Sequence, residues 1–227
     1  MSPRPRTVDD HTILEAAARV MSRIGPEKLT LADVGAEAGL SAATLVQRFG
    51  SKRDLMLSIL RHSCQAVDTR FTAAMESHES PLESLFLAAM DRVGPREGPG
   101  TVSNRLAFFM ASLDDPEFHA LALENSDNAI AGYMTMIDRA IAAGELSDAI
   151  IIDRESFART IHAMTYGSLV AWSIRRQGSL RGRVRRDLDT LIRPFRRGPR
   201  KASSFSHLDE TEMPETSFAA ASPATVS

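Results

Sequence analysis

Apolar residues recur every three or four positions along most of this 227-residue chain, and no strand-like alternation competes with that spacing. Such spacing places the apolar residues on one face of an α-helix, whereas a half-buried strand needs alternation between apolar and polar positions. The clearest example lies before the helix-stopping pair Gly25-Pro26 and comprises Ile13, Ala17, Val20, Met21 and Ile24. The pattern therefore predicts an all-α fold of about nine helices without a sheet.

Capping signals predict where these helices begin. A serine or threonine followed three residues later by an acid can form a capping box, and this occurs at Thr7–Asp10, Thr30–Asp33, Ser51–Asp54 and Ser80–Glu83. Asp115-Pro116 predicts another start, with proline at the first helical position of a long helix that runs towards Gly144. Two later apolar stripes predict the last helices, one ending near Gly178 and one reaching Phe195.

The net charge of −2 is unevenly distributed along the chain. Residues 1–62 carry +2, residues 63–174 carry −9, residues 175–201 carry +9 and residues 202–227 carry −4. Together with the helix pattern, these changes predict a first domain over 1–62, a second over 63–197 and a tail over 198–227. The tail has few large apolar residues, so we expect it to be disordered.

A short helix pair over residues 31–50 is the most informative local motif. Two helices of about seven residues flank a tight turn at Gly39, and Ser41 can cap the second helix. The small residues Gly35 and Ala38 allow the close crossing of a helix-turn-helix, whose second helix enters the major groove of DNA. An ordinary helical hairpin remains the alternative, because short glycine turns are common.

Residues 8–62 resemble the DNA-binding region of the TetR/AcrR family of bacterial transcriptional regulators. The likeness rests on Thr30 through Val34, Ala38 through Ser41, Thr44-Leu45, Phe49, Ser51-Lys52 and Asp54-Leu55. It implies an N-terminal three-helix helix-turn-helix domain followed by a helical domain for ligand binding and dimerisation. It also implies a homodimer that binds a palindromic DNA operator and is released from it by a small molecule.

The resemblance and the side-chain chemistry together give a set of expected DNA contacts. Gln47 is the one side chain of the second helix suited to bidentate reading of adenine. Members of the family commonly have a tyrosine at the position of Val46. Arg48 is expected to replace the phosphate contact of that tyrosine. Lys52 is expected to contact a phosphate at a helix N-terminus. The complete expected set is Thr30, Ser41, Ala42, Ala43, Thr44, Gln47, Arg48 and Lys52.

Catalytic and metal-binding motifs are missing from the sequence. The six histidines form no metal-ligand spacing with one another or with Cys64, the single cysteine, and no phosphate-binding or nucleophile motif occurs. We therefore expect no enzymatic activity, no cofactor and no metal. No apolar run is long enough to span a membrane, and the first residues lack the apolar stretch of a signal peptide, so a cytoplasmic protein without membrane partners is expected.

Large and adaptable side chains in the second domain could line a pocket for a largely apolar effector. The candidates are Phe86, Met90, Phe108, Phe109, Tyr133, Met136, Met164 and Trp172. Plain core packing is the alternative for each of them. For the whole chain, the alternative to a ligand-responsive repressor is an all-helical small-molecule binding protein or enzyme without a DNA function.

Overall fold

The structure is a computed structural model that describes residues 8–94 and 98–197. In these two ranges the chain forms nine α-helices, two short 3-10 segments and no strand, which confirms the predicted all-α fold. The helices are α1 (Asp10–Ile24), α2 (Leu31–Ala38), α3 (Ala42–Phe49), α4 (Lys52–Glu76), α5 (Pro81–Arg92), α6 (Pro99–Ser112), α7 (Pro116–Ala142), α8 (Arg154–Arg175) and α9 (Leu180–Ile192). The predicted tail, 198–227, lies outside the described residues.

The capping signals define most helix starts as predicted. Thr30 and Asp33 form a complete capping box at α2, and Ser51, Ser80 and Asp115 cap α4, α5 and α7. The first start differs, because Asp9 caps α1 by accepting a hydrogen bond from the backbone N–H of Thr12 at 2.8 Å. Thr7, the expected cap, lies outside the described residues.

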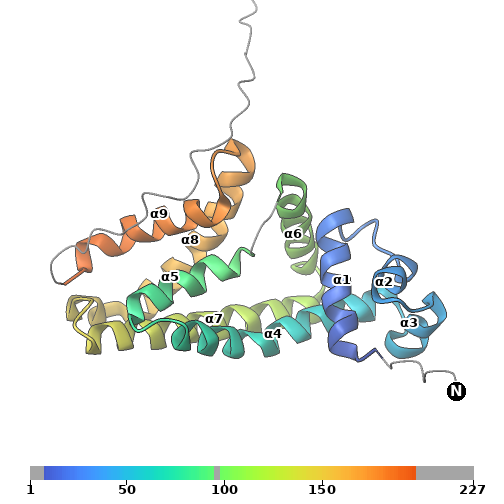
Figure 1. Cartoon of the computed structure of the whole chain (residues 1–227), viewed down its shortest axis with the longest axis horizontal. Coiled ribbons are helices and arrows are strands. Elements are labelled where there is room, and N and C mark those ends of the chain that lie inside the picture. Colours follow the sequence, from blue (N-terminus) through green and yellow to red (C-terminus); the bar gives the residue numbers. More distant parts are fainter. Residues whose placement is uncertain (1–7, 95–97, 198–227) are drawn as a thin grey trace, which may run out of the picture. The chain divides into compact units, whose positions relative to one another are not determined.

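Helices α1 to α3 gather around the first half of α4 (Figure 1) and enclose one apolar core. Its buried side chains include Ile13, Val20, Val34, Leu45 and Leu55. Phe108 from α6 and Phe118 from the first turn of α7 also pack into this core. The core therefore includes residues well beyond 62, the expected end of the first domain.

A second core fills the space between the rest of α4 and helices α5, α7, α8 and α9. Its buried side chains include Phe86, Tyr133, Met136 and Trp172. Helix α4 belongs to both cores, because Leu55 and Ile59 lie in the first while Val67, Phe71 and Ala74 lie in the second. The division at 62/63 thus falls within one continuous helix.

The basic segment near the chain's end is held against the acidic region that precedes it. Arg181 of α9 pairs with Asp91 at 2.9 Å, and Arg185 pairs with Glu83 at 2.8 Å. Part of the positive charge of this segment is therefore paired within the chain. Among the described helices, none combines the length and the apolar character that crossing a membrane requires.

Candidate nucleic-acid interface and small-molecule site

The turn between α2 and α3 depends on two glycines. Gly39 has a φ of 70° in the left-handed region, which glycine adopts without the steric cost of a side chain. A Cβ atom on Gly35 would lie 2.7 Å from the backbone carbonyl oxygen of Leu40, so the close approach of the two helices also requires glycine. This geometry sets the angle at which α3 leaves α2 and confirms the predicted helix pair.

Helix α3 turns Leu45 and Phe49 towards the core, and its outward face carries small and polar side chains together with Val46. Leu45 is fully buried beneath the helix, whereas Ala42, Ala43 and Gln47 are exposed. Ser41 caps the helix by accepting from the backbone N–H of Thr44 at 3.1 Å, and the two hydroxyl groups lie 2.8 Å apart. The outward face can therefore approach a nucleic-acid groove closely, with Gln47 as its longest exposed amide.

The cationic residues expected at this face are held by acceptors of the protein itself. Arg48 donates to the backbone carbonyl of Val8 at 2.5 Å and lies 3.2 Å from Asp10, while Lys52 donates to the backbone carbonyl of Glu27 at 2.7 Å. Their charge still contributes to the potential of the surface, but a phosphate would have to share or displace these acceptors.

Sequence reasoning missed Lys28, which is exposed and has no hydrogen bond or ion pair within the described residues. It lies two residues before Thr30, whose hydroxyl accepts from the backbone N–H of Asp33 at 3.1 Å. A lysine two residues before a capping box is a signal that the sequence contained, because cations and helix N-termini both attract phosphate.

The second core contains buried polar groups without partners. The hydroxyl of Tyr133 on α7 and Nδ1 of His162 on α8 are both buried and accept or donate no hydrogen bond among the described residues. The other ring nitrogen of His162 lies 3.2 Å from the hydroxyl of Ser126. Most buried polar groups in proteins are paired, so these two atoms represent hydrogen-bonding capacity that the described residues of this core do not use.

Burial also changes the proton affinities of these two groups. It raises the pKa of Tyr133 to about 12 and lowers the pKa of His162 to about 4. The positive charge of Arg92 on α5 acts on both groups: it offsets part of the rise in the pKa of Tyr133 and adds to the fall in the pKa of His162, whereas no carboxylate contributes to either shift. At neutral pH the site therefore offers a neutral phenol and a neutral imidazole beside a guanidinium group.

The residues expected to line a pocket are distributed over both cores. Tyr133 and Met136 are fully buried in the second core, and Met90 and Met164 pack at its edge. Phe109 stacks on Tyr166 with ring centroids 5.2 Å apart, and the ring of Tyr166 in turn meets that of His162 edge to face. Elsewhere in the second core, Phe86 lies under the guanidinium groups of Arg185 and Arg196. The ring N–H of Trp172 donates to the backbone carbonyl of Gly178 at 2.8 Å. Phe108 belongs to the first core.

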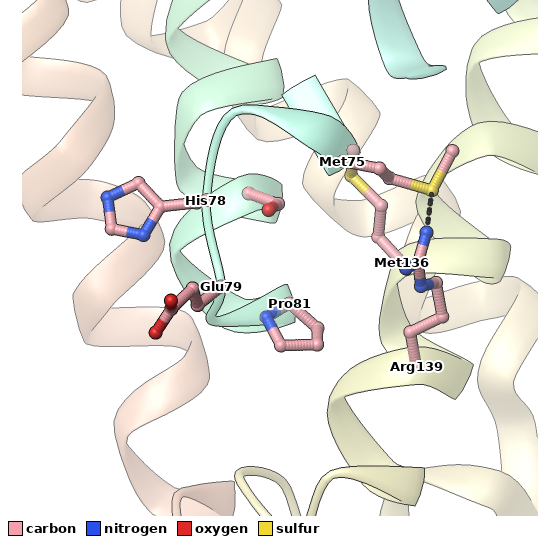
Figure 2. A pocket seen from close by; sticks show the side chains of 7 residues that line it. Met75, His78, Glu79, Pro81, Met136 and Arg139 are labelled. Carbon is pink, nitrogen blue, oxygen red and sulfur yellow. Dashed lines mark hydrogen bonds between the residues drawn. The ribbon is translucent and has the colours of Figure 1, made fainter. Parts of the chain in front are cut away.

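Two open depressions lie near the second core. The first, of about 220 Å³, lies where α4 ends and α5 begins and is lined by Met75, Pro81, Met136 and Arg139 among others (Figure 2). There Arg139 of α7 donates to the sulfur of Met75 at 3.0 Å. The second, of about 250 Å³, lies between α4 and α5 and is lined by Val67, Arg70, Phe71, Ala88, Asp91 and Arg92. Within the described ranges, no group of three potential metal ligands occurs.

One face of α8 remains uncovered. Val170 and Ile174 on this face are 43% and 77% exposed, and the small residues Ala163 and Gly167 continue it towards the helix start. The spacing of these four residues puts them on one side of the helix. By contrast, Ile161 and Trp172 of the same helix are buried within the protomer.

Comparisons with known proteins agree with this architecture. Residues 13–59 match the sequence model for bacterial regulatory proteins of the tetR family. The chain is 27% identical over 128 residues to the HTH-type transcriptional regulator BetI of Agrobacterium fabrum, covering 56% of this chain and 62% of that protein. It is 30% identical over 112 residues to BetI of Rhizobium meliloti, covering 48% and 54% of the two chains. The match thus spans less than two thirds of either relative.

Solved structures with the same fold cover more of the chain. A transcriptional regulator from Saccharomonospora viridis, determined in complex with choline, superposes with a TM-score of 0.66 and 22% identity over 83% of this chain and 97% of its own. A TetR-family regulator from Rhodococcus superposes with a TM-score of 0.60 and 22% identity over 80% and 96% of the two chains. At this identity the likeness concerns the fold of both the first and the second core.

Proposed function

We propose that this chain is a repressor of the tetR family that binds a palindromic operator and is released by a small molecule, because residues 13–59 match that family's sequence model and the curated relatives are transcriptional regulators. The observation that carries the DNA part is the exposed face of α3, held at a fixed angle by Gly35 and Gly39. Gln47 reads a base edge, Ala42 and Ala43 contact thymine methyl groups, and Lys28 and Lys52 contact phosphates.

The operator-binding form in this proposal is a homodimer. Two copies of the exposed α8 face with Val170 and Ile174 associate around a two-fold axis, with α9 beside it. Small residues at Ala163 and Gly167 let the two helices approach closely. The two recognition helices then meet successive major grooves, which is the arrangement that a palindromic operator requires.

The effector in this proposal is a small, largely apolar molecule with polar groups that satisfy Tyr133 and His162. The aromatic rings of Phe109 and Tyr166 lie beside His162 and would contact its apolar part. Choline, found in the Saccharomonospora viridis structure, carries a positive charge. Around Tyr133 and His162 the charged group that acts is instead a cation, Arg92.

In this proposal helix α4 couples effector binding to operator binding, since it contributes side chains to both cores. Arg53 in its first turn also pairs at 2.8 Å with Asp115, the N-cap residue of α7, and α7 carries Tyr133 farther along. A ligand that favours one arrangement of α4 against α7 therefore changes the placement of α3.

The test is electrophoretic retardation of the DNA upstream of the chain's own gene, measured at several salt concentrations. Gln47→Ala should change the preference at one operator position by roughly 1–3 kcal/mol, whereas Lys28→Ala should weaken all sequences alike and lower the salt slope by about one. An unchanged ranking of all single-base operator variants by Gln47→Ala would show that Gln47 does not read a base. Absence of retardation at low salt would reject the DNA function.

A further inference from the structure

The depression between α4 and α5 combines an apolar floor with two cations. Val67, Phe71 and Ala88 are buried and form the floor, while Arg70 of α4 and Arg92 of α5 lie on its walls. The depression is shallow and open to solvent, and its lining comes from two helices that pack against each other, α4 and α5. An apolar floor beneath guanidinium groups is complementary to an amphipathic anion.

Neither arginine has a carboxylate partner among the described residues, unlike arginines such as Arg53, Arg181 and Arg185. Arg92 donates one hydrogen bond, to the side-chain oxygen of Asn125 at 3.1 Å, and Arg70 makes no hydrogen bond or ion pair with another described residue. Asp91 also lines the depression, but it is paired with Arg181 at 2.9 Å.

The electrostatics of Arg70 reflect this lack of partners. Desolvation lowers its pKa, the positive charges of Arg92 and Arg105 lower it further, and Asp91 and Glu15 offset only part of this. Positive charge is therefore concentrated here at some cost to the protein. A bound anion would remove that cost, because it screens the mutual repulsion of the guanidinium groups.

The depression adjoins the buried polar groups of the second core. The ring of Phe71 on its floor meets the ring of Tyr133 edge to face, with centroids 5.0 Å apart. Arg92 bonds Asn125, and the next residue on α7, Ser126, bonds His162. A molecule whose acid group lies at the arginines can thus influence the same helices that carry Tyr133 and His162.

We propose that the α4–α5 depression binds an amphipathic carboxylate, whose acid group pairs with Arg70 and Arg92 and whose apolar part lies against Val67, Phe71 and Ala88. The assignment of this molecule as the effector rests on the proposed repressor function. The binding site itself does not. The charge of the depression selects against a quaternary ammonium compound of the same size.

The experiment compares three probes with one tail: octanoate, octanol and octyltrimethylammonium. Their binding to the full-length protein is measured by calorimetry and by the shift in melting temperature. We expect octanoate to bind at least tenfold more tightly than octanol and octyltrimethylammonium to bind least. Arg70→Gln and Arg92→Gln should each weaken octanoate at least tenfold and leave octanol unchanged.

Arg61→Gln is the matched control, since Arg61 lies on the same helix, is exposed and loses the same charge. It should leave octanoate affinity unchanged. The proposal is overturned if octanoate does not bind the wild-type protein, if the ammonium probe binds more tightly, or if neither depression variant weakens octanoate. It is also overturned if Arg61→Gln weakens binding as much as they do. Melting temperatures of the free variants verify that each one folds.

Operator retardation separates this proposal from the repressor function. If octanoate binds through Arg70 and Arg92 but the protein does not retard operator DNA, the carboxylate site is supported and the repressor function is rejected. If the protein binds its operator and octyltrimethylammonium releases it while octanoate does not, the repressor function is supported and the carboxylate site fails as the effector site.

Discussion

The two cores of this protein differ in how completely they satisfy their own polar groups. The core around α1 to α3 is made of apolar side chains such as Ile13, Leu45 and Leu55. The three buried side-chain atoms without a hydrogen bond among the described residues are Tyr133 Oη, His162 Nδ1 and Arg154 Nε, and all belong to helices of the second region. The first core holds one shape on its own, whereas the second has hydrogen-bonding capacity that a ligand can use.

The cations show the same difference. Near α3, Arg48, Lys52 and Arg53 are all held by acceptors within the chain. In the α4–α5 depression, Arg70 and Arg92 have no carboxylate partner within the described ranges. The unpaired charge of the described residues is thus not confined to the surface expected to meet DNA, and Arg70 and Arg92 are candidates for binding something smaller.

The largest effect should follow from a cavity in the first core. Leu45→Ala removes a fully buried side chain from under α3, and we expect unfolding free energy to fall by about 2–5 kcal/mol. Urea denaturation followed by circular dichroism measures this. The neighbouring Val46→Ala, at a side chain that is 51% exposed, should change stability by less than about 0.5 kcal/mol. Equal effects of the two changes would contradict the inward placement of Leu45.

The second core should be sensitive to acid through His162. Its folded-state pKa of about 4 lies below the value of about 6.5 expected in the unfolded chain, so the unfolded chain binds a proton more readily as the pH falls. The contribution of neutral His162 to the free energy of unfolding is therefore complete above pH 6.5 and is lost as the pH falls towards 4. Between pH 7.5 and pH 5 this amounts to about 2 kcal/mol.

The measurement is the difference in unfolding free energy between the wild type and His162→Gln at the two pH values. That difference should change by about 2 kcal/mol in favour of the glutamine variant at pH 5. The exposed His78→Gln serves as the control and should show no such change. Parallel pH profiles for wild type and His162→Gln would mean that His162 is solvated in the folded protein.

The capping box of α2 should contribute less than either core. The hydroxyl of Thr30 accepts from the backbone N–H of Asp33 at 3.1 Å, and the backbone N–H of Thr30 donates to Asp33 at 3.0 Å. Thr30→Ala should therefore cost about 1 kcal/mol of unfolding free energy, while Thr30→Ser should retain most of it. A serine variant as unstable as the alanine variant would point to the methyl group rather than the cap.

The smallest effect is expected where a polar group already lacks a partner. Tyr133→Phe removes a buried hydroxyl that makes no hydrogen bond, so stability should remain unchanged or rise by up to about 1 kcal/mol. Trp172→Phe removes a donor that does bond, to the carbonyl of Gly178, and should be destabilising. A loss of more than about 1 kcal/mol in Tyr133→Phe would show that the hydroxyl is satisfied in solution.

Local signals explain why so much of the first region could be predicted. The Thr30–Asp33 box, the turn at Gly39 and the cap at Ser41 each involve residues a few positions apart, and each appears where the sequence indicated. The second site depends on contacts between distant helices. No spacing in the sequence shows that Arg70 and Arg92 face one depression, or that Arg48 bonds a carbonyl forty positions earlier.

Core membership was also beyond local reasoning. Phe108 carries the same kind of apolar signal as Phe86, yet the two side chains lie in different cores because α6 packs against α1. Packing between distant helices also buries Ile161, Trp172 and Leu188 within one protomer. The exposed stripe of α8 lies on another side of that helix, at Val170 and Ile174. An apolar stripe indicates that a face is covered without indicating what covers it.

Helix α4 is continuous from Lys52 to Glu76, so a small rotation about one of its ends displaces the other end by a larger distance. Its 25 residues give a length of about 38 Å at 1.5 Å per residue, with the α3 contact at one end and the α4–α5 depression in its farther half. A rotation of about 5° about the far end displaces the near end by about 3 Å over that length. In the proposed switch, a bound molecule would therefore need to move its own surroundings by only a fraction of the resulting displacement of α3.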